Sequence, residues 1–217
     1  MPRRSLCGKL ESIRGSLDPG QYIGVHVDKA RVAIIGVSGF GNIHYQDIMR
    51  AWKAGLVDIV CATVINAEEE AEKCEALRAA GCELFRNADA MFQRHAGAVD
   101  LCFLPVGIGL HAPLSIAAMR AGMNVFVEKP LAPTVQDADA IIAASNETGR
   151  FAAVGYQHLY QPQIHAMKRA ILDGRIGRLR AGRGIGLWPR DRTYYRRNNW
   201  AGRLSGPAGW ILDSPVN

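Results

Sequence analysis

The sequence predicts an α/β fold built on a doubly wound parallel sheet. Apolar, strand-like runs alternate with segments of helical periodicity from about residue 31 to residue 173, and glycine follows most of the helical segments. Connections from a strand through a helix to a parallel strand are right-handed, so this alternation builds a single sheet with helices on both faces.

Each element of the alternation has its own signal. Residues 31–36 are apolar and end in glycine, and residues 42–55 place Ile48 and Trp52 four apart before Gly55 ends a helix. Thr134 and Asp137 have the spacing of a capping box at a helix start. The other expected strands are 57–65, 82–85, 99–105, 124–130 and 151–157, and the other expected helices are 67–81, with acids in its first turn, 88–94, 111–122, 134–148 and about 162–173.

The composition is that of a globular chain without membrane or secretory signals. The 217 residues are 48% hydrophobic, but no apolar run approaches the roughly 20 residues of a membrane-spanning helix, and residues 1–16 lack the apolar core of a secretory signal. Five cysteines without a CxxC pair indicate neither a disulfide framework nor a zinc site; they are Cys7, Cys61, Cys74, Cys82 and Cys102. We therefore expect a cytoplasmic protein with reduced thiols, no bound metal and no membrane partner.

Three parts are expected along the chain. Residues 1–29 have no steady period and form an N-terminal extension, residues 30–150 form the sheet domain, and residues 151–217 form a linker and part of a second domain. The last part holds 11 Lys or Arg against 3 Asp or Glu, whereas residues 1–150 hold 15 against 17. This basic block fits an anionic substrate or nucleic acid, and equally an interface or solvated surface.

A glycine-rich turn joins the first strand directly to the first helix. Because unpaired amides at a helix start can bind a pyrophosphate, this turn predicts a dinucleotide-binding Rossmann domain, whereas a P-loop is disfavoured because no Gly-Lys-Ser/Thr follows. Ser38 replaces the middle glycine of the GxGxxG pattern, so that its hydroxyl donates to phosphate or its Cβ keeps the cofactor at a distance. The expected cofactor contacts in this turn are Gly36, Ser38, Gly39, Phe40, Gly41, Asn42 and Ile43.

Asn66 follows the second strand, where an acid usually binds the adenosine ribose. An asparagine can bond ribose hydroxyls without repelling a 2′-phosphate, but no arginine stands beside it to bind one. A helix cap is an equally good interpretation of Asn66. The sequence therefore leaves NAD and NADP both open as the cofactor.

Glu128, Lys129 and Pro130 lie at the carboxyl end of an expected parallel strand, the edge where ligands bind in open α/β sheets. Gln157 follows another strand at the same edge. A lysine there is a functional residue or a solvated one before a proline turn. With the glycine turn closed by His44, the LPVGIGLH loop, the AGMNVFVEKPLA segment and ILDGRIGRL, the sequence resembles the Gfo/Idh/MocA family of glucose-fructose oxidoreductases and inositol dehydrogenases over about residues 31–180.

The resemblance implies hydride transfer between bound NAD or NADP and a sugar, cyclic polyol or related carbonyl compound. Lys129 would handle the proton of the reacting hydroxyl, with Glu128 and the Pro105 loop beside the nicotinamide. We expect His111 and Gln157 among the cofactor contacts. The family usually completes its site with an aspartate and, four residues later, a histidine; here Asp213 is followed by Asn217, which cannot shuttle a proton near neutral pH.

The family's second domain is α+β, with a large antiparallel sheet that covers the active site and commonly forms a homo-oligomer interface. Because the sequence ends near its beginning, we expect an exposed apolar face and interpret the chain as a fragment, a natural truncation or a subunit that needs a partner. Residues 188–203 interleave arginines with Trp and Tyr, which fits a loop for an anionic sugar, or an interface, better than single-stranded nucleic acid.

Two functions stay open. The first is an NAD(P)-dependent dehydrogenase acting on CH–OH groups of a small-molecule substrate, with Lys129 and Asp213 as catalytic residues. The second is a dinucleotide-binding protein without turnover, a sensor or partner subunit, which the early chain end and Asn217 favour. A nucleic-acid-binding module rests only on the basic segment, and we do not expect it.

Overall fold

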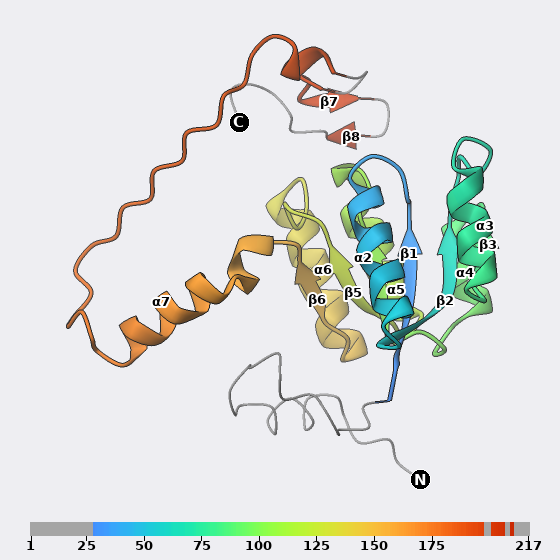
Figure 1. Cartoon of the computed structure of the whole chain (residues 1–217), viewed down its shortest axis with the longest axis horizontal. Coiled ribbons are helices and arrows are strands. Elements are labelled where there is room, and N and C mark those ends of the chain that lie inside the picture. Colours follow the sequence, from blue (N-terminus) through green and yellow to red (C-terminus); the bar gives the residue numbers. More distant parts are fainter. Residues whose placement is uncertain (1–27, 198–200, 207–208, 211–217) are drawn as a thin grey trace.

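A six-stranded parallel sheet forms the centre of the computed structural model, which describes residues 28–197, 201–206 and 209–210 (Figure 1). Its strand order is β3-β2-β1-β4-β5-β6, with every pair parallel. The strands are β1 (Ala30–Ile35), β2 (Val57–Thr63), β3 (Glu83–Phe85), β4 (Leu101–Leu104), β5 (Asn124–Val127) and β6 (Ala152–Val154). The predicted doubly wound parallel sheet is confirmed.

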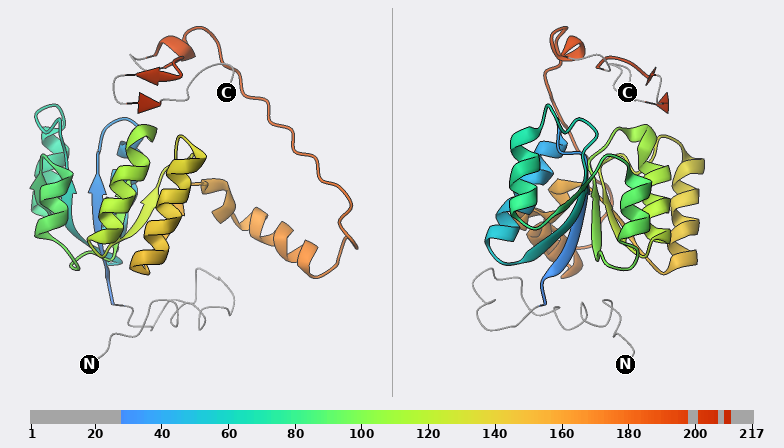
Figure 2. Two further views of the ribbon diagram at one scale, coloured as in Figure 1. Left: turned by 180° about the vertical axis from the view of Figure 1, so that it is seen from behind. Right: turned by 90° about the vertical axis from the view of Figure 1, so that its right-hand side faces the viewer.

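Helices cover both faces of this sheet (Figure 2). One face carries α2 (Gly41–Lys53) and α3 (Ala71–Ala79); the other carries α4 (Ala88–Arg94), α5 (His111–Arg120) and α6 (Val135–Thr148). The change of face follows from topology, because right-handed crossovers that run outward from β1 to β3 and then back from β4 to β6 must place their helices on opposite sides.

The core lies on both faces, as the continuous apolar strands require. Side chains of β1 alternate across the sheet: Val32 and Ile34 pack with the cluster under α2 and α3, whereas Ala33 and Ile35 pack with the cluster under α4, α5 and α6. All four are buried. β1 is thereby held from both sides, which fixes the position of the turn that follows it.

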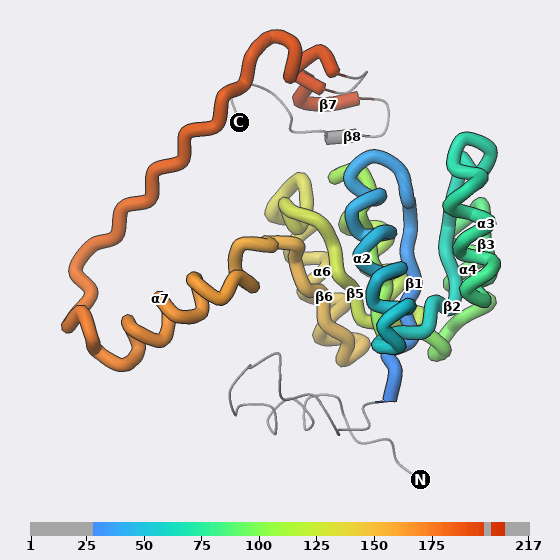
Figure 3. The backbone as a smooth tube through the Cα atoms, in the orientation of Figure 1, coloured from blue at the N-terminus to red at the C-terminus, as the bar shows by residue number. Residues whose placement is uncertain are grey.

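β1 and β4 are neighbours at the point where the strand order reverses. The chain leaves β1 toward one face and β4 toward the other, and in open α/β sheets ligands bind at the carboxyl edge beside such a pair of loops. The loop after β4 contains the short helix η2 (Ile108–Leu110) and leads into α5. The backbone trace in Figure 3 shows the loop from β1 into α2 at this edge.

The helix expected over residues 67–81 begins only at Ala71, so that part of the prediction is wrong. The backbone amides of Glu69 and Glu70 both donate to the carbonyl of Asn66, at 3.1 and 3.2 Å, and close a turn before the helix. Glu70 is the N-cap. All three glutamates, Glu68 to Glu70, therefore lie in the turn at the end of β2, and the acid in the first helical turn is Glu72.

The C-terminal part of the described chain leaves the sheet. After η3 (Gln157–Tyr160), α7 (Pro162–Leu172) extends outward without a buried residue, and an extended segment then leads to η4 (Tyr194–Arg196) and a small antiparallel pair, β7 (Ser205–Gly206) and β8 (Gly209–Trp210). β8 returns to contact η2 at the carboxyl edge (Figure 1). Large apolar side chains are exposed along this part, among them Met167, Leu172, Ile185, Leu187 and Trp188.

The four cysteines in the described part of the chain are free and buried. Burial raises the pKa of the Cys61 and Cys82 thiols to about 12, and it also raises the pKa of Cys102. Cys61, Cys82 and Cys102 are therefore protonated thiols of low reactivity at neutral pH. No described helix has the length and apolar character needed to cross a bilayer.

The N-terminus of α6 confirms the predicted capping box. The amide of Asp137 donates to Thr134 Oγ1 at 3.1 Å, and that hydroxyl donates to the Asp137 carboxylate at 2.7 Å. Thr134→Ala should lower the free energy of unfolding by about 1 kcal/mol, because an orphan helix amide loses its acceptor. Urea unfolding measures this. Thr134→Ser keeps the hydroxyl and should cost much less; an equal loss in both variants would contradict the capping role.

Candidate functional site

The glycine turn between β1 and α2 depends on a close approach of backbone to backbone. Gly36 has φ +88°, a left-handed conformation, and its amide donates to Thr63 at the end of β2 at 2.9 Å. A Cβ on Gly41 would lie 2.7 Å from the carbonyl oxygen of Gly36. These positions require glycine because of local sterics, as the sequence pattern predicts.

The same turn leaves backbone donors available. The amides of Ser38, Gly39 and Phe40 have no hydrogen-bond partner within the described ranges, and a Cβ on Gly39 would meet only open space. Asn42 and Ile43 follow in the first turn of α2. Consecutive free amides at a helix start suit a phosphate group, so the turn fits the pyrophosphate of a dinucleotide.

Ser38 and Asn66 join the glycine turn to the end of β2. Asn66 Nδ2 lies 2.9 Å from Ser38 Oγ, which in turn lies 3.2 Å from Asn66 Oδ1. Asn66 Nδ2 also donates to the Glu69 carboxylate at 3.0 Å. The interpretation of Asn66 as a helix cap is wrong, because Glu70 occupies that position. In this structure the Ser38 hydroxyl is hydrogen-bonded to the side chain of Asn66.

Lys73, which the sequence analysis did not select, reaches this turn from α3. Its ammonium donates to the carbonyl of Val37 at 2.9 Å and forms an ion pair with Glu70 at 2.6 Å. The hydrogen bond from Lys73 holds the pKa of Glu70 below its usual value, with a smaller contribution from a hydrogen bond to Ser38. The run of three glutamates after Asn66 is the sequence signal for this charged cluster.

Glu128 and Lys129 follow β5 at the same edge. The Glu128 carboxylate is buried and lies 2.9 Å from Nε2 of His44 on α2, and its other oxygen accepts from the Lys129 amide at 3.2 Å. The rings of Phe40, Phe103 and Phe126 surround His44. The Lys129 side chain is exposed, and its ammonium has no hydrogen bond or ion pair to any described residue. A substrate at this edge can therefore reach it.

His111, at the start of α5, is 2% exposed. Its Nδ1 lies 2.7 Å from the carbonyl of Pro130 and its Nε2 lies 3.1 Å from the carbonyl of Val106. The ring thus joins the loop after β4, which contains Pro105, to the loop after β5. This geometry makes His111 a support for both loops, and its expected contact with the cofactor stays a prediction.

An apolar groove of about 680 Å³ runs beside α2 along the open face of β1, β4 and β5. It reaches from Val57 to Glu128 and Gln157 at the carboxyl edge, and Phe103, Phe126 and Tyr160 line it. The groove is an exposed apolar face, as the sequence predicts. It includes Glu128 at the carboxyl edge and continues to Val32 and Val57 near the start of their strands.

Gly155, after β6, limits the space for the buried carboxylate. A Cβ there would lie 2.5 Å from one Glu128 oxygen and 3.0 Å from its carboxyl carbon. Gly155→Ala should therefore displace the carboxylate from His44 and lower the free energy of unfolding by about 1–3 kcal/mol. Urea unfolding measures the loss. Gly182→Ala is the matched control, because a Cβ there meets nothing within 4 Å.

A double-mutant cycle tests the cause of this loss. In a Glu128→Ala background the carboxylate is absent, so Gly155→Ala should cost little or nothing. An undiminished cost in that background would show that the clash with Glu128 is not the reason.

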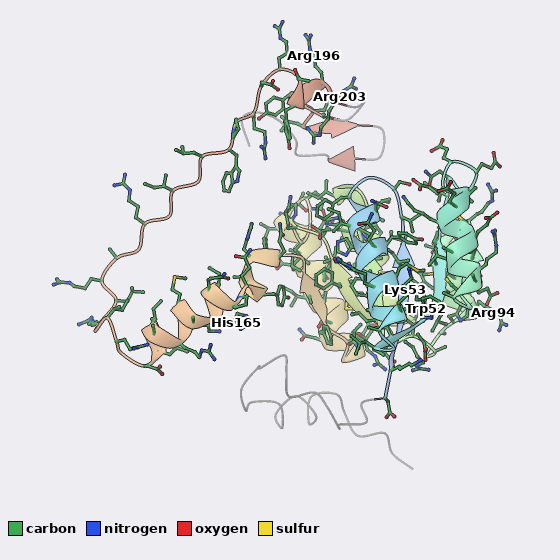
Figure 4. The ribbon with its side chains drawn as sticks, in the orientation of Figure 1. Trp52, Lys53, Arg94, His165, Arg196 and Arg203 are labelled. Carbon is green, nitrogen blue, oxygen red and sulfur yellow. The ribbon has the colours of Figure 1, made fainter. Side chains whose placement is uncertain are left out.

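Other predicted groups lie outside this cluster. Asp213 and Asn217 are outside the described residues. Two guanidinium groups lie over the Tyr194 ring, with Arg190 4.2 Å and Arg197 3.9 Å from the ring centroid. Figure 4 shows Arg196 and Arg203 on the same segment. Within the described ranges, no three His, Cys, Asp or Glu residues come together as a metal site would require.

Comparison with known proteins assigns a family to this arrangement. Residues 30–156 match the model of an oxidoreductase family with an NAD-binding Rossmann fold. The chain is 29% identical over 156 residues to a dTDP-3,4-didehydro-2,6-dideoxy-alpha-D-glucose 3-reductase of Streptomyces violaceoruber, covering 72% of this chain and 44% of the relative. It is 32% identical over 145 residues to an inositol 2-dehydrogenase of Azotobacter vinelandii, covering 66% and 42%.

A solved structure agrees with these matches. The WlbA dehydrogenase of Bordetella pertussis, in complex with NADH and UDP-GlcNAcA, superposes with a TM-score of 0.64 and 26% identity, covering 81% of this chain and 52% of that one. The chain spans less than half the length of the curated relatives it matches.

Proposed function

We propose, since the chain belongs to the Gfo/Idh/MocA family of oxidoreductases, that it is the cofactor-binding half of a dehydrogenase that oxidises a CH–OH group of a sugar or polyol. One observation carries the proposal: the free amides of Ser38, Gly39 and Phe40 and the exposed Lys129 lie on the same edge of one sheet. The first site suits a pyrophosphate and the second suits a reacting hydroxyl.

The cofactor and the chain divide the chemistry between them. Bound NAD would supply the hydride acceptor. Lys129 would hold the substrate hydroxyl and accept its proton, or stabilise the oxygen as it loses that proton. Buried Glu128, bonded to His44 and to the Lys129 amide, keeps the strand end in place. Asp213 is proposed as the second catalytic residue, and Gln157 as a contact at the nicotinamide end.

The substrate is proposed from what the relatives act on and from charge. The names of the relatives include a deoxysugar nucleotide reductase and inositol dehydrogenases. Arg190 and Arg197, whose guanidinium groups pack on the Tyr194 ring, favour an anionic sugar as the substrate. The reason is that guanidinium groups bind carboxylates and phosphates in bidentate fashion. We propose that residues 30–150 form the cofactor domain and that residues 151–217 form a linker and the start of the substrate domain. A full substrate domain would also form the homo-oligomer interface.

A second function has specific support. Asn217 stands where the family usually has a proton-shuttling histidine, and an asparagine cannot carry a proton near neutral pH. A protein that binds the dinucleotide without turnover, as a sensor or a partner subunit, fits this residue.

Titration of the 217-residue chain with NADH, followed by energy transfer from tryptophan to the reduced nicotinamide, tests the proposal. We expect saturable binding. A folded sample that does not bind NADH would refute the cofactor-binding function. Reduction of NAD by the same protein with a panel of polyols and sugar nucleotides then separates the two functions, because only the dehydrogenase accumulates NADH.

A further inference from the structure

A compact group of charged residues surrounds the end of β2, where the adenosine ribose of a dinucleotide lies in a Rossmann domain. Asn66 occupies the usual position of the ribose-binding acid, but its amide nitrogen is engaged by Ser38 and by Glu69. The carboxylate of Glu69, exposed and bonded to Asn66, therefore presents a charged acceptor beside the end of the strand. Glu70 lies beside it and belongs to the same turn.

The cations of this group are already paired. The ammonium of Lys73 is shared between Glu70 at 2.6 Å and the Val37 carbonyl at 2.9 Å. Arg86, after β3, lies 3.5 Å from Glu68. Three carboxylates thus face two cations, and the surplus charge is negative. The lowered pKa of Glu70 keeps its carboxylate ionised at neutral pH.

We propose that Glu69 and Glu70 make this site selective for NAD(H) over NADP(H). The inference rests on the proposed function, because it requires the dinucleotide to lie over the glycine turn. Glu69 would accept a hydrogen bond from a ribose hydroxyl, which the unphosphorylated cofactor offers. A 2′-phosphate removes that donor and brings a negative charge against two carboxylates, and like-charge contact of this kind weakens binding on the order of 10²-fold.

Lys73 is the residue that could reverse this preference. It stands where a phosphate-binding cation would be needed, but it would have to leave Glu70 and the Val37 carbonyl to bind one. The ion pair thus supports selectivity in two ways: it holds the Glu70 carboxylate in the turn after β2, and it occupies the ammonium of Lys73.

The experiment is a pair of titrations, with NADH and with NADPH, on the full 217-residue chain and its variants. The wild type should bind NADH about 100-fold more tightly than NADPH. The double variant Glu69→Gln/Glu70→Gln should bind NADPH more tightly than the wild type does. Its ratio of NADH affinity to NADPH affinity should fall to roughly tenfold or less. The matched control, Glu72→Gln/Glu75→Gln, removes two negative charges from exposed positions of α3 and should leave the ratio of the two affinities unchanged. Circular dichroism checks that each variant is folded.

The other outcomes are distinct. Equal affinity of the wild type for both cofactors overturns the selectivity and leaves the proposed function standing. Preference for NADPH that is lost in Lys73→Gln also overturns it, and assigns Lys73 as a phosphate ligand. An unchanged ratio in the double variant shows that the two carboxylates do not discriminate. Binding of neither cofactor by a folded sample refutes the proposed function, and with it this inference.

Discussion

Replacing Lys129 by alanine is expected to lower the rate of hydride transfer by about 10²–10⁴-fold, the range that a positioned acid–base group contributes. The affinity for NADH should stay nearly the same. The reason is geometric: the Lys129 ammonium has no partner in the described part of the chain, whereas the pyrophosphate site is formed by backbone amides after β1. The substitution thus removes a proton-handling group without disturbing the turn that binds the cofactor.

The measurement is NADH formation with a substrate that the wild type oxidises, together with an NADH titration of the same sample. Lys53→Ala is the matched control, because Lys53 is exposed at the C-terminal end of α2 (Figure 4), away from the carboxyl edge. Small primary amines added to Lys129→Ala should restore part of the rate. Full activity in Lys129→Ala would exclude the catalytic role, and an equal loss in Lys53→Ala would show that charge alone is responsible.

The fold could be predicted from sequence because its signals are local. The glycine turn, the apolar strands and the capping box of Thr134 each depend on residues within a few positions of one another, and the structure confirms them. The parallel direction of the strands follows from the alternation of strands and helices. The position of Lys129 at the carboxyl edge is a consequence of that direction and needed no side-chain information.

The electrostatic details of the site could not be predicted in the same way. His44 and Glu128 are 84 residues apart, and only the adjacency of α2 to β5 brings them to 2.9 Å. Lys73 reaches Val37 across 36 residues. In the sequence, Gly155 is an ordinary glycine at the end of a strand. Only the structure shows that the Glu128 carboxylate packs against it. Each of these contacts depends on packing between elements, which periodicity does not encode.

The predicted start of α3 is wrong for a related reason. Acidic residues are favourable in the first turn of a helix, so the glutamates after Asn66 fit an early start. In the structure the Asn66 side chain is bonded to Ser38 and Glu69, and its carbonyl accepts two amides in a turn. A long-range contact with the glycine turn thus competes with the local preference and delays the helix.

Gly41→Ala is expected to lower the free energy of unfolding by about 1–3 kcal/mol and to abolish measurable NADH binding. The added Cβ would lie 2.7 Å from the carbonyl oxygen and 3.1 Å from the carbonyl carbon of Gly36. Both atoms belong to backbone that is held by β1 and by the bond from Gly36 to Thr63, so no side chain can rotate away to relieve the clash. The start of α2 must move instead, and the free amides move with it.

Stability and binding must be measured separately, since a partly unfolded variant would also fail to bind. Urea unfolding gives the loss of stability, and NADH titration at low temperature, on a sample with native circular dichroism, gives the loss of affinity. Gly184→Ala, where a Cβ would meet nothing within 4 Å, controls for the general effect of replacing glycine. A folded Gly41→Ala that binds NADH as the wild type does would mean that the dinucleotide does not depend on this turn, because a shift of the α2 N-terminus could not leave its phosphate contacts intact.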